Sequence, residues 1–162
     1  MSDNVYLGNP NLKKANTQIQ FSAKQIEEFV KCKNDPVYFA KKYVKIVSLD
    51  EGLVPFQPYK FQEKLIKRFH RERFNICKMP RQTGKSTTVV SYLLHYAVFN
   101  DSVNIGILAN KAATARELLG RLQTAYENLP RWMQQGIIAW NKGSLELENG
   151  SKILAASTSA SA

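Results

Sequence analysis

The sequence has few cysteines and no long apolar run. Only Cys32 and Cys77 occur among 162 residues, and neither has the spacing of a metal ligand. We therefore expect two reduced, packed thiols rather than a disulfide or a zinc site. No apolar run approaches the length of a membrane span, and the polar start over residues 1–14 lacks the core of a signal peptide. A cytoplasmic protein with no membrane partner is expected.

Acidic residues are also scarce. The chain holds 13 Asp and Glu against 23 Lys and Arg, which gives a formal net charge of +10. Such a chain has an acidic polymer among its expected partners, nucleic acid first, because phosphate contacts supply sequence-independent affinity. The alternative is that the charge only maintains solubility or complements an acidic protein. With 44% hydrophobic residues the chain is long enough to bury one ordinary core.

The chain does contain a loop that predicts phosphate binding. The sequence MPRQTGKS over residues 79–86 lies between an apolar run at 74–79, interpreted as a strand, and a helix-compatible segment at 86–99. A strand that turns tightly into a helix leaves several backbone N–H groups pointing at one spot, where the helix dipole is positive. Gly84 allows close backbone approach, Lys85 reaches the outer phosphates, and the Ser86 hydroxyl is placed to bind Mg²⁺.

The motif departs from the full phosphate-loop pattern. Met79 occupies the position of its first glycine, and a bare Gly-Lys-Ser triplet occurs often by chance. The predicted strand before the loop and helix after it favour the phosphate interpretation. The alternative is a basic surface turn that carries the triplet incidentally.

The N-terminal part predicts an arm followed by two short helices. Residues 1 to about 20 have little apolar periodicity, so we expect a poorly ordered, extended lead-in. Ser22 and Gln25 form a capping-box pattern that begins a helix of about ten residues. A second short helix follows, with Asp35 as its N-cap and Pro36 as its first residue.

A third helix is predicted after an irregular piece at residues 48–58. It extends from Pro58 to about Arg71 and has an apolar face. Cations occupy the positions between the apolar residues: Lys60, Lys64, Lys67, Arg68 and Arg71. We interpret this row as a solvated helix face.

The start of this third helix offers candidates for adenine recognition. A glutamine side chain can accept from the adenine N6 amine and donate to N7, and Gln57 and Gln62 are the candidates. An aromatic ring can stack on the purine face, as Tyr59 or Phe61 would. The alternative is a polar helix surface over an aromatic core anchor.

The second half of the chain alternates in the α/β manner. Residues 103–109 form an almost continuous apolar run, which is typical of a parallel strand covered on both faces. A helix is predicted at 112–128, and the helix at 86–99 should pack between the sheet and another layer. Three short strands follow, the last two joined by an Asn149-Gly150 hairpin: residues 137–140, 144–148 and 151–156.

No carboxylate suited to holding Mg²⁺ follows the loop. A nucleotide hydrolase needs an acid at the end of a strand for the metal and usually another for the attacking water. None of the later acids closes an apolar run of four or five residues: Asp101, Glu117, Glu127, Glu146 and Glu148. We expect this carboxylate beyond Ala162, since ending here would leave a sheet edge open. The chain therefore looks truncated.

The residues quoted so far resemble a known family. The chain is similar to the ATPase domain of the large terminase subunit, the DNA-packaging motor of tailed bacteriophages, especially of the T-even type. An Arg-Gln pair in place of the glycine-rich middle of the loop resembles that family's variant of the motif. The segments that carry the resemblance are PNLKKAN at 10–16, VYFA at 37–40, RQTGKS at 81–86, IGILANK at 105–111 and WNKGS at 140–144.

The resemblance implies a fold and a set of site residues. The implied fold is α/β, a truncated parallel sheet of the P-loop NTPase (ASCE or RecA-like) kind with flanking helices. A helical region at residues 1–57 would precede a partial ATPase domain at 58–162. Lys85 and Arg81 would be catalytic, with Arg81 sensing or stabilising the γ-phosphate, and Ser86 would bind Mg²⁺. The implied nucleotide-binding residues are Gln57, Phe61, Gln62, Arg81, Gln82, Thr83, Gly84, Lys85, Ser86 and Thr87.

The resemblance also implies a function. ATP and Mg²⁺ would be the cofactors, and the family's acidic metal strand, catalytic glutamate, coupling motif and nuclease domain would all follow Ala162. The partners would be double-stranded DNA, a portal protein, a small terminase subunit and further copies in a ring, in the host cytoplasm. Two alternatives stay open: a related superfamily DNA helicase or translocase, and a DNA-binding module with an inactive nucleotide pocket.

Overall fold

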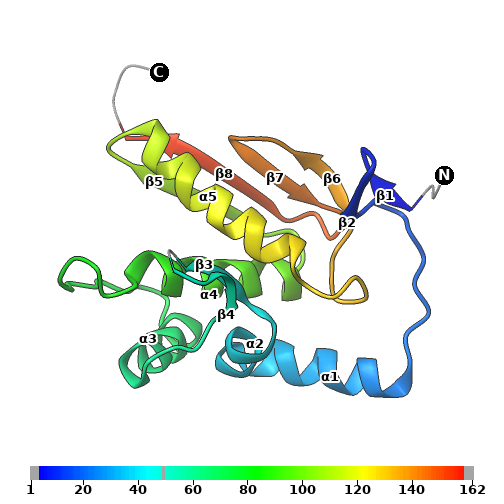
Figure 1. Ribbon diagram of the computed structural model, residues 1–162, viewed down its shortest axis with the longest axis horizontal. Coiled ribbons are helices and arrows are strands. Elements are labelled where there is room, and N and C mark those ends of the chain that lie inside the picture. Colours follow the sequence, from blue (N-terminus) through cyan, green and yellow to red (C-terminus); the bar gives the residue numbers. More distant parts are fainter. Residues whose placement is uncertain (1–3, 49, 159–162) are drawn as a thin grey trace.

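A computed structural model describes residues 4–48 and 50–158, and it shows an α/β arrangement in layers. Figure 1 shows the sheet as one outer layer, with helix α5 (Ala112–Glu127) against it, α4 (Lys85–Phe99) next, and α1, α2 and α3 farthest from the strands. Residues 1–3 of the expected arm and 159–162 of the expected ATPase part lie outside the described residues. No helix of the described residues is long and apolar enough to cross a membrane.

The predicted N-terminal helices are confirmed together with their caps. Helix α1 (Ala23–Asn34) starts with the capping box in which Ser22 and Gln25 each bond the other's backbone. In α2 (Pro36–Tyr43), the Asp35 carboxylate accepts from two backbone N–H groups of the first turn. These helices therefore begin where local side-chain chemistry places them.

Helices α3 (Lys60–Arg71) and α4 are also confirmed, but α4 lies mainly between helices on both sides, whereas the sheet was expected on one of them. Phe39 on α2 and Leu94 on α4 are fully buried, and α4 packs against α2 and α3 on one side and α5 on the other. His95 of α4 lies in this core at 1% exposure, with its Nε2 2.8 Å from the Cys32 carbonyl oxygen. The core is thus built around α4.

Within the described residues the main sheet has four strands in the order β5-β8-β7-β6, and it is mixed rather than parallel. Strands β5 (Asn104–Ala109) and β8 (Lys152–Ser157) pair in parallel, as Ile105 with Ile153. Strand β7 (Ser144–Leu147) joins β8 through the predicted Asn149-Gly150 hairpin, and β6 (Ile137–Trp140) pairs antiparallel with β7.

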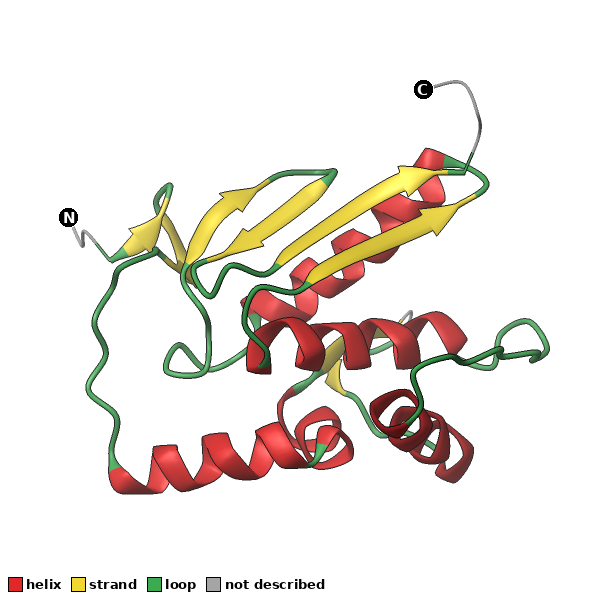
Figure 2. Ribbon diagram, turned by 180° about the vertical axis from the view of Figure 1, so that it is seen from behind, coloured by secondary structure: helices red, strands yellow, loops and turns green. Residues whose placement is uncertain are grey.

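Helices cover only one face of this sheet, which corrects the expectation of a strand buried on both faces. Ile105, Ile107 and Ile153 face α5 and the core, whereas Leu108 and Leu154 on the other face are 64% and 59% exposed. Figure 2 shows the open face with α5 behind the strands. The apolar run at 103–109 therefore alternates between buried and exposed positions, the pattern of a half-covered sheet.

The prediction of a poorly ordered N-terminal arm is wrong for much of residues 1–20. Strands β1 (Val5–Tyr6) and β2 (Asn9–Lys13) form an antiparallel hairpin at the β6 end of the sheet. The Lys13 backbone N–H donates to Gln134 Oε1 at 3.0 Å, and its ammonium lies 2.9 Å from a Glu148 carboxylate oxygen. Contacts with residues more than a hundred positions away order this segment, so local periodicity could not reveal it.

Two further expectations are corrected between α2 and α4. The piece expected to be irregular, residues 48–58, contains strand β4 (Gly52–Pro55), which pairs antiparallel with β3 (Lys45–Ser48) just before it. The strand expected at 74–79 is absent: that segment is a loop, in which Phe74 and Ile76 are 83% and 101% exposed. A strand needs a neighbour for its backbone groups, and no described strand pairs with this segment.

Candidate nucleotide site

The candidate site is the loop at 80–84 that leads into α4. Gly84 is the N-cap of α4 in the left-handed conformation, with φ at 71°, and Gln82 also has a positive φ of 60°. The Thr83 hydroxyl donates to the Pro80 carbonyl at 3.0 Å, which closes the turn. Two left-handed residues so close together fold the backbone into a compact loop.

The start of α4 is suited to an anion. No side chain caps this helix, and its first turn has no acidic residue. The Thr88 N–H and hydroxyl both donate to the Gly84 carbonyl, at 3.0 and 2.9 Å, so the N–H groups before Thr88 are left without intrahelical acceptors. Free N–H groups at the positive end of a helix fit a phosphate group.

The Lys85 side chain turns back over the loop. Its ammonium donates to the Met79 carbonyl at 3.0 Å and also to the Pro80 carbonyl. Lys85 is therefore not directed into open solvent, and its charge is held at the loop that precedes α4. To reach a bound phosphate it would exchange carbonyl acceptors for phosphate oxygens, which are stronger partners because they are charged.

Gln62 joins α3 to the underside of the loop. It is 3% exposed, and its Nε2 donates to the Thr83 and Gly84 carbonyls at 3.3 and 3.4 Å. Its Oε1 accepts from the Tyr59 N–H at 2.8 Å. Both ends of the amide are thus engaged within the protein, and recognition of adenine by Gln62 would require these bonds to be exchanged.

The other predicted adenine residues lie at the surface before and within α3. Phe61 is 44% exposed and stacks on Tyr59, with ring centroids 5.8 Å apart. Gln57 is exposed, and within residues 4–48 and 50–158 no hydrogen bond joins its side chain to the loop. The structure therefore brings Gln62 to the loop and leaves Gln57 outside it.

The remaining predicted loop residues surround Lys85. Arg81, Gln82 and Ser86 are exposed, and Thr87 is half-buried on the first turn of α4. No acidic side chain among the described residues forms an ion pair with Arg81. Arg81 is therefore free to contact an anion at the loop.

The fit of Mg²⁺ is only partial. Ser86 supplies one hydroxyl at the start of α4, but the part of the chain described contains no group of three His, Cys, Asp or Glu side chains that could hold a metal. Mg²⁺ usually keeps several waters and binds through one or two carboxylates together with substrate phosphates. The loop thus fits a phosphate chain better than it fits a metal alone.

A small cavity of about 150 Å³ lies under the first turns of α4. It is lined by Lys85, Ser86, Val89, Val90, Leu93, Ile107 and Leu118. Ligand pockets usually measure about 300 to 1,000 Å³, so this cavity is too small for a nucleotide. A triphosphate would have to lie on the outer side of the loop, where Arg81 and Ser86 are exposed.

Sequence reasoning missed the contacts that shape the loop. The Pro80 carbonyl accepts from both Thr83 and Lys85, and Gln82 adopts a conformation that disfavours most side chains. The link between Gln62 and the loop joins positions 21 and 22 residues apart. No local sequence pattern predicts this hydrogen bond, although Gln62 does lie on the apolar face predicted for α3.

Fold and loop together define an α/β protein with an anion-compatible loop at a helix start. Residues 76–162 match the family "Terminase large subunit, T4likevirus-type, N-terminal". Since this match takes in more than half of the chain, the chain belongs to the family of T4-like large terminase subunits, of which it represents an N-terminal portion.

A solved structure has a similar fold. The chain superposes on the crystal structure of the HK97 bacteriophage large terminase with a TM-score of 0.63 at 15% sequence identity. The match covers 80% of this chain and 28% of that terminase, so this chain spans less than a third of the length of its structural relative. At this identity the likeness concerns the fold alone.

Proposed function

We propose that this chain is the ATP-binding portion of a bacteriophage DNA-packaging motor. In the complete motor, ATP binding and hydrolysis at this loop would drive double-stranded DNA into the capsid. The observation that carries the proposal is the start of α4, whose N–H groups have no side-chain cap and whose Lys85 ammonium is held at the loop by the Met79 carbonyl. Membership in the large terminase family supports the assignment of ATP as the ligand.

The proposed roles are electrostatic. The backbone N–H groups of residues 84–87 would hold the β-phosphate, and Lys85 would leave the Met79 carbonyl to neutralise the outer phosphates. Mg²⁺ supplied with ATP would neutralise charge between the phosphates, with the Ser86 hydroxyl among its ligands. Arg81, which forms no ion pair with an acid of the described residues, would contact the γ-phosphate.

For this chain we propose nucleotide binding rather than turnover. Hydrolysis needs a carboxylate that orients the attacking water, and the described residues provide no cluster of acids at the loop. ATP binding needs only the loop, the helix start and Lys85. Portal protein, small terminase subunit and ring assembly remain proposals that follow from the family alone.

The test is ATP binding by the 162-residue chain, measured by isothermal titration calorimetry in the presence of Mg²⁺. We expect the wild-type chain to bind ATP and Lys85→Ala to bind at least tenfold more weakly, because the variant loses the charge at the phosphates. Lys24→Ala is the matched control, since Lys24 is an exposed lysine on α1. Equal ATP affinity in Lys85→Ala and Lys24→Ala would refute the role of Lys85.

A second candidate is a DNA-binding module whose nucleotide pocket is inactive. One observation favours it: the Lys85 ammonium is already held by the Met79 and Pro80 carbonyls, so the cation has partners without a phosphate. This candidate predicts no measurable ATP binding by the wild-type chain. It also predicts a DNA affinity that neither ATP nor Lys85→Ala changes.

A further inference from the structure

Helix α3 presents a stripe of positive charge to solvent. Five exposed cations fall within about 100° of the helix circumference at 100° per residue, opposite the buried Gln62 and Ile66. At 1.5 Å per residue the stripe is about 16 Å long. Its members are Lys60, Lys64, Lys67, Arg68 and Arg71.

Acidic side chains of the described residues neutralise only one cation of this stripe, Arg71. Glu63, the one acid of α3, lies 2.7 Å from Lys41 of α2, and Glu72 lies 2.6 Å from Arg71. The other four cations of the stripe form no ion pair with any described residue. Their charge is therefore available to a partner.

The positive charge continues past the end of α3. Arg73 lies over the exposed Phe74 ring at 5.2 Å, and Lys78 is exposed a few residues further on. Residues 60–78 hold seven cations and two acids, so 19 residues carry half of the formal net charge of +10. The stripe and this extension together are called the α3 basic surface.

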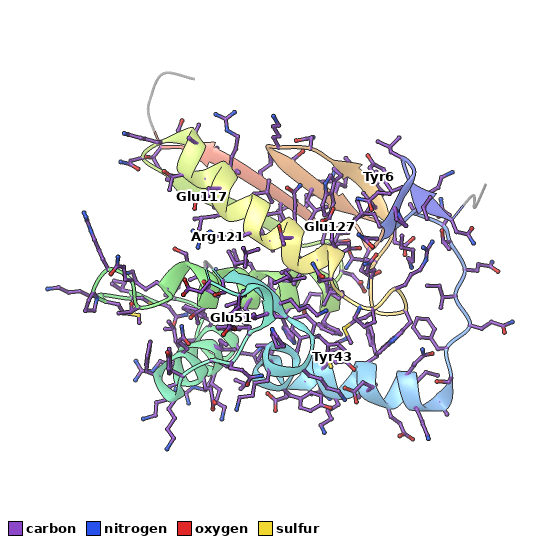
Figure 3. The ribbon with its side chains drawn as sticks, viewed as in Figure 1. Tyr6, Tyr43, Glu51, Glu117, Arg121 and Glu127 are labelled. Carbon is purple, nitrogen blue, oxygen red and sulfur yellow. The ribbon has the colours of Figure 1, made fainter. Side chains whose placement is uncertain are left out.

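Helices α1 and α5 are close to balanced, and the two lysines of α2, Lys41 and Lys42, are both paired with acids of other helices. Helix α1 has three lysines and two glutamates, and its Lys31 lies over the Tyr38 ring. Helix α5 has two arginines and two glutamates, of which Arg121 and Glu117 form an i,i+4 pair at 2.7 Å (Figure 3). A face whose only task is solubility does not need its charge in one place, so the imbalance on α3 calls for an anionic partner.

We propose that the α3 basic surface binds the phosphate backbone of duplex DNA. Lysine and arginine side chains on one helix face supply contacts to phosphates without reading base sequence, as a DNA-moving protein requires. The choice of duplex DNA as the polyanion rests on the proposed function. Gln62, on the opposite side of the same helix, bonds the loop, so α3 separates the α3 basic surface from the candidate nucleotide site.

The test compares two triple variants with the same loss of charge. The first variant, the α3 triple, combines Lys60→Gln, Lys64→Gln and Lys67→Gln. The second, the scattered triple, changes three exposed lysines away from α3: Lys24→Gln, Lys33→Gln and Lys142→Gln. Binding to a short duplex of random sequence is measured by fluorescence anisotropy between about 50 and 200 mM salt. A Lys→Arg triple at positions 60, 64 and 67 tests rescue by charge.

We expect the α3 triple to bind duplex DNA at least tenfold more weakly. Its salt dependence, as log K against log salt, should be less steep by about 2.7, which is 0.9 for each of three lost phosphate contacts. The scattered triple should stay within about threefold of wild type, and the Lys→Arg triple should retain full affinity. Circular dichroism and thermal unfolding check that each variant is folded.

Equal losses of DNA affinity in the α3 triple and the scattered triple would overturn the proposal, because the affinity would then depend on net charge alone. Polyglutamate competing as well as the duplex at equal charge would overturn it too, in favour of an acidic protein partner. ATP titration of the α3 triple separates this proposal from the previous one: we expect unchanged ATP binding. Failure of the wild-type chain to bind ATP would remove the proposed nucleotide site and leave the DNA result standing.

Discussion

The segments on either side of the candidate loop differ sharply. Residues 74–79 enter the loop as exposed chain without secondary structure, whereas α4 leaves it as a helix that is buried over most of its length. Both segments are apolar, and the sequence predicts regular structure for both. The difference is that a helix forms its hydrogen bonds within itself, while a strand needs a neighbour.

The two segments also differ in how far their side chains are buried. Ile76 is fully exposed at 101%, and Leu94 on α4 is 0% exposed. The loop is therefore held from its exit side, by α4 and by the bonds from Gln62, and not from its entry side. The conformation of the loop therefore depends on α4 and Gln62 more than on residues 74–79.

The largest expected difference is in the free energy of unfolding, between a side-chain truncation in α4 and one in residues 74–79. Leu94→Ala should lower the free energy of unfolding by about 2 to 5 kcal/mol, because it leaves a cavity in the core around α4. Ile76→Ala should change it by less than about 0.5 kcal/mol, since the side chain touches little. Urea unfolding followed by circular dichroism measures both. A loss above about 1 kcal/mol in Ile76→Ala would mean that the entry segment is packed, and the comparison would break.

The stability of the protein should also depend on pH, because His95 of α4 is buried in the core. Burial lowers the pKa of His95 from 6.5 to about 4, despite the hydrogen bond to the Cys32 carbonyl that favours the charged form. The unfolded chain therefore binds the proton more readily than the folded one. Stability should be full above pH 6.5 and fall toward pH 4, by at most about 3 kcal/mol.

Urea unfolding at a series of pH values measures this effect. In His95→Phe the fall between pH 6.5 and 4 should become shallower, because no titrating ring remains in the core. Ile76→Ala, at an exposed position that carries no titrating group, is the control and should keep the wild-type slope. A slope unchanged in His95→Phe would assign the pH dependence to other groups.

The sequence predicts best what local chemistry decides. The capping side chains Ser22 and Asp35 locate the starts of α1 and α2, and Asn149-Gly150 locates a hairpin, because each signal lies within a few residues of its effect. The position of Gly84 and Lys85 at the start of α4 follows from the same kind of signal. These parts of the fold and of the candidate site were accessible without coordinates.

Contacts between distant positions explain what sequence reasoning missed. The β1–β2 hairpin depends on Lys13 reaching Glu148, and the shape of the loop depends on Gln62 reaching Gly84. The strand predicted at 74–79 fails for the converse reason, because no described strand pairs with it. Hydrophobic pattern indicates where a strand is compatible with the sequence, but a partner decides whether it forms.

The smallest effect expected concerns Gly84, where the two sides of the loop meet. Its φ of 71° disfavours side chains, and a Cβ built there would lie 2.5 Å from Gln62 Nε2. Gly84→Ala should therefore destabilise the protein by about 1 to 2 kcal/mol, measured by urea unfolding. Part of that loss is backbone strain, and part is displacement of the Gln62 amide from the Thr83 and Gly84 carbonyls.

A double-mutant cycle with Gln62→Ala separates the two parts of this loss. Without the Gln62 amide the added methyl meets no clash, so the double variant should lose at least about 0.5 kcal/mol less than the sum of the single losses. Gly52→Ala, at another left-handed glycine with open space around its Cβ, gives the strain alone. Strict additivity between Gly84→Ala and Gln62→Ala would show that Gln62 does not support the loop, and the exit side would then rely on α4 alone.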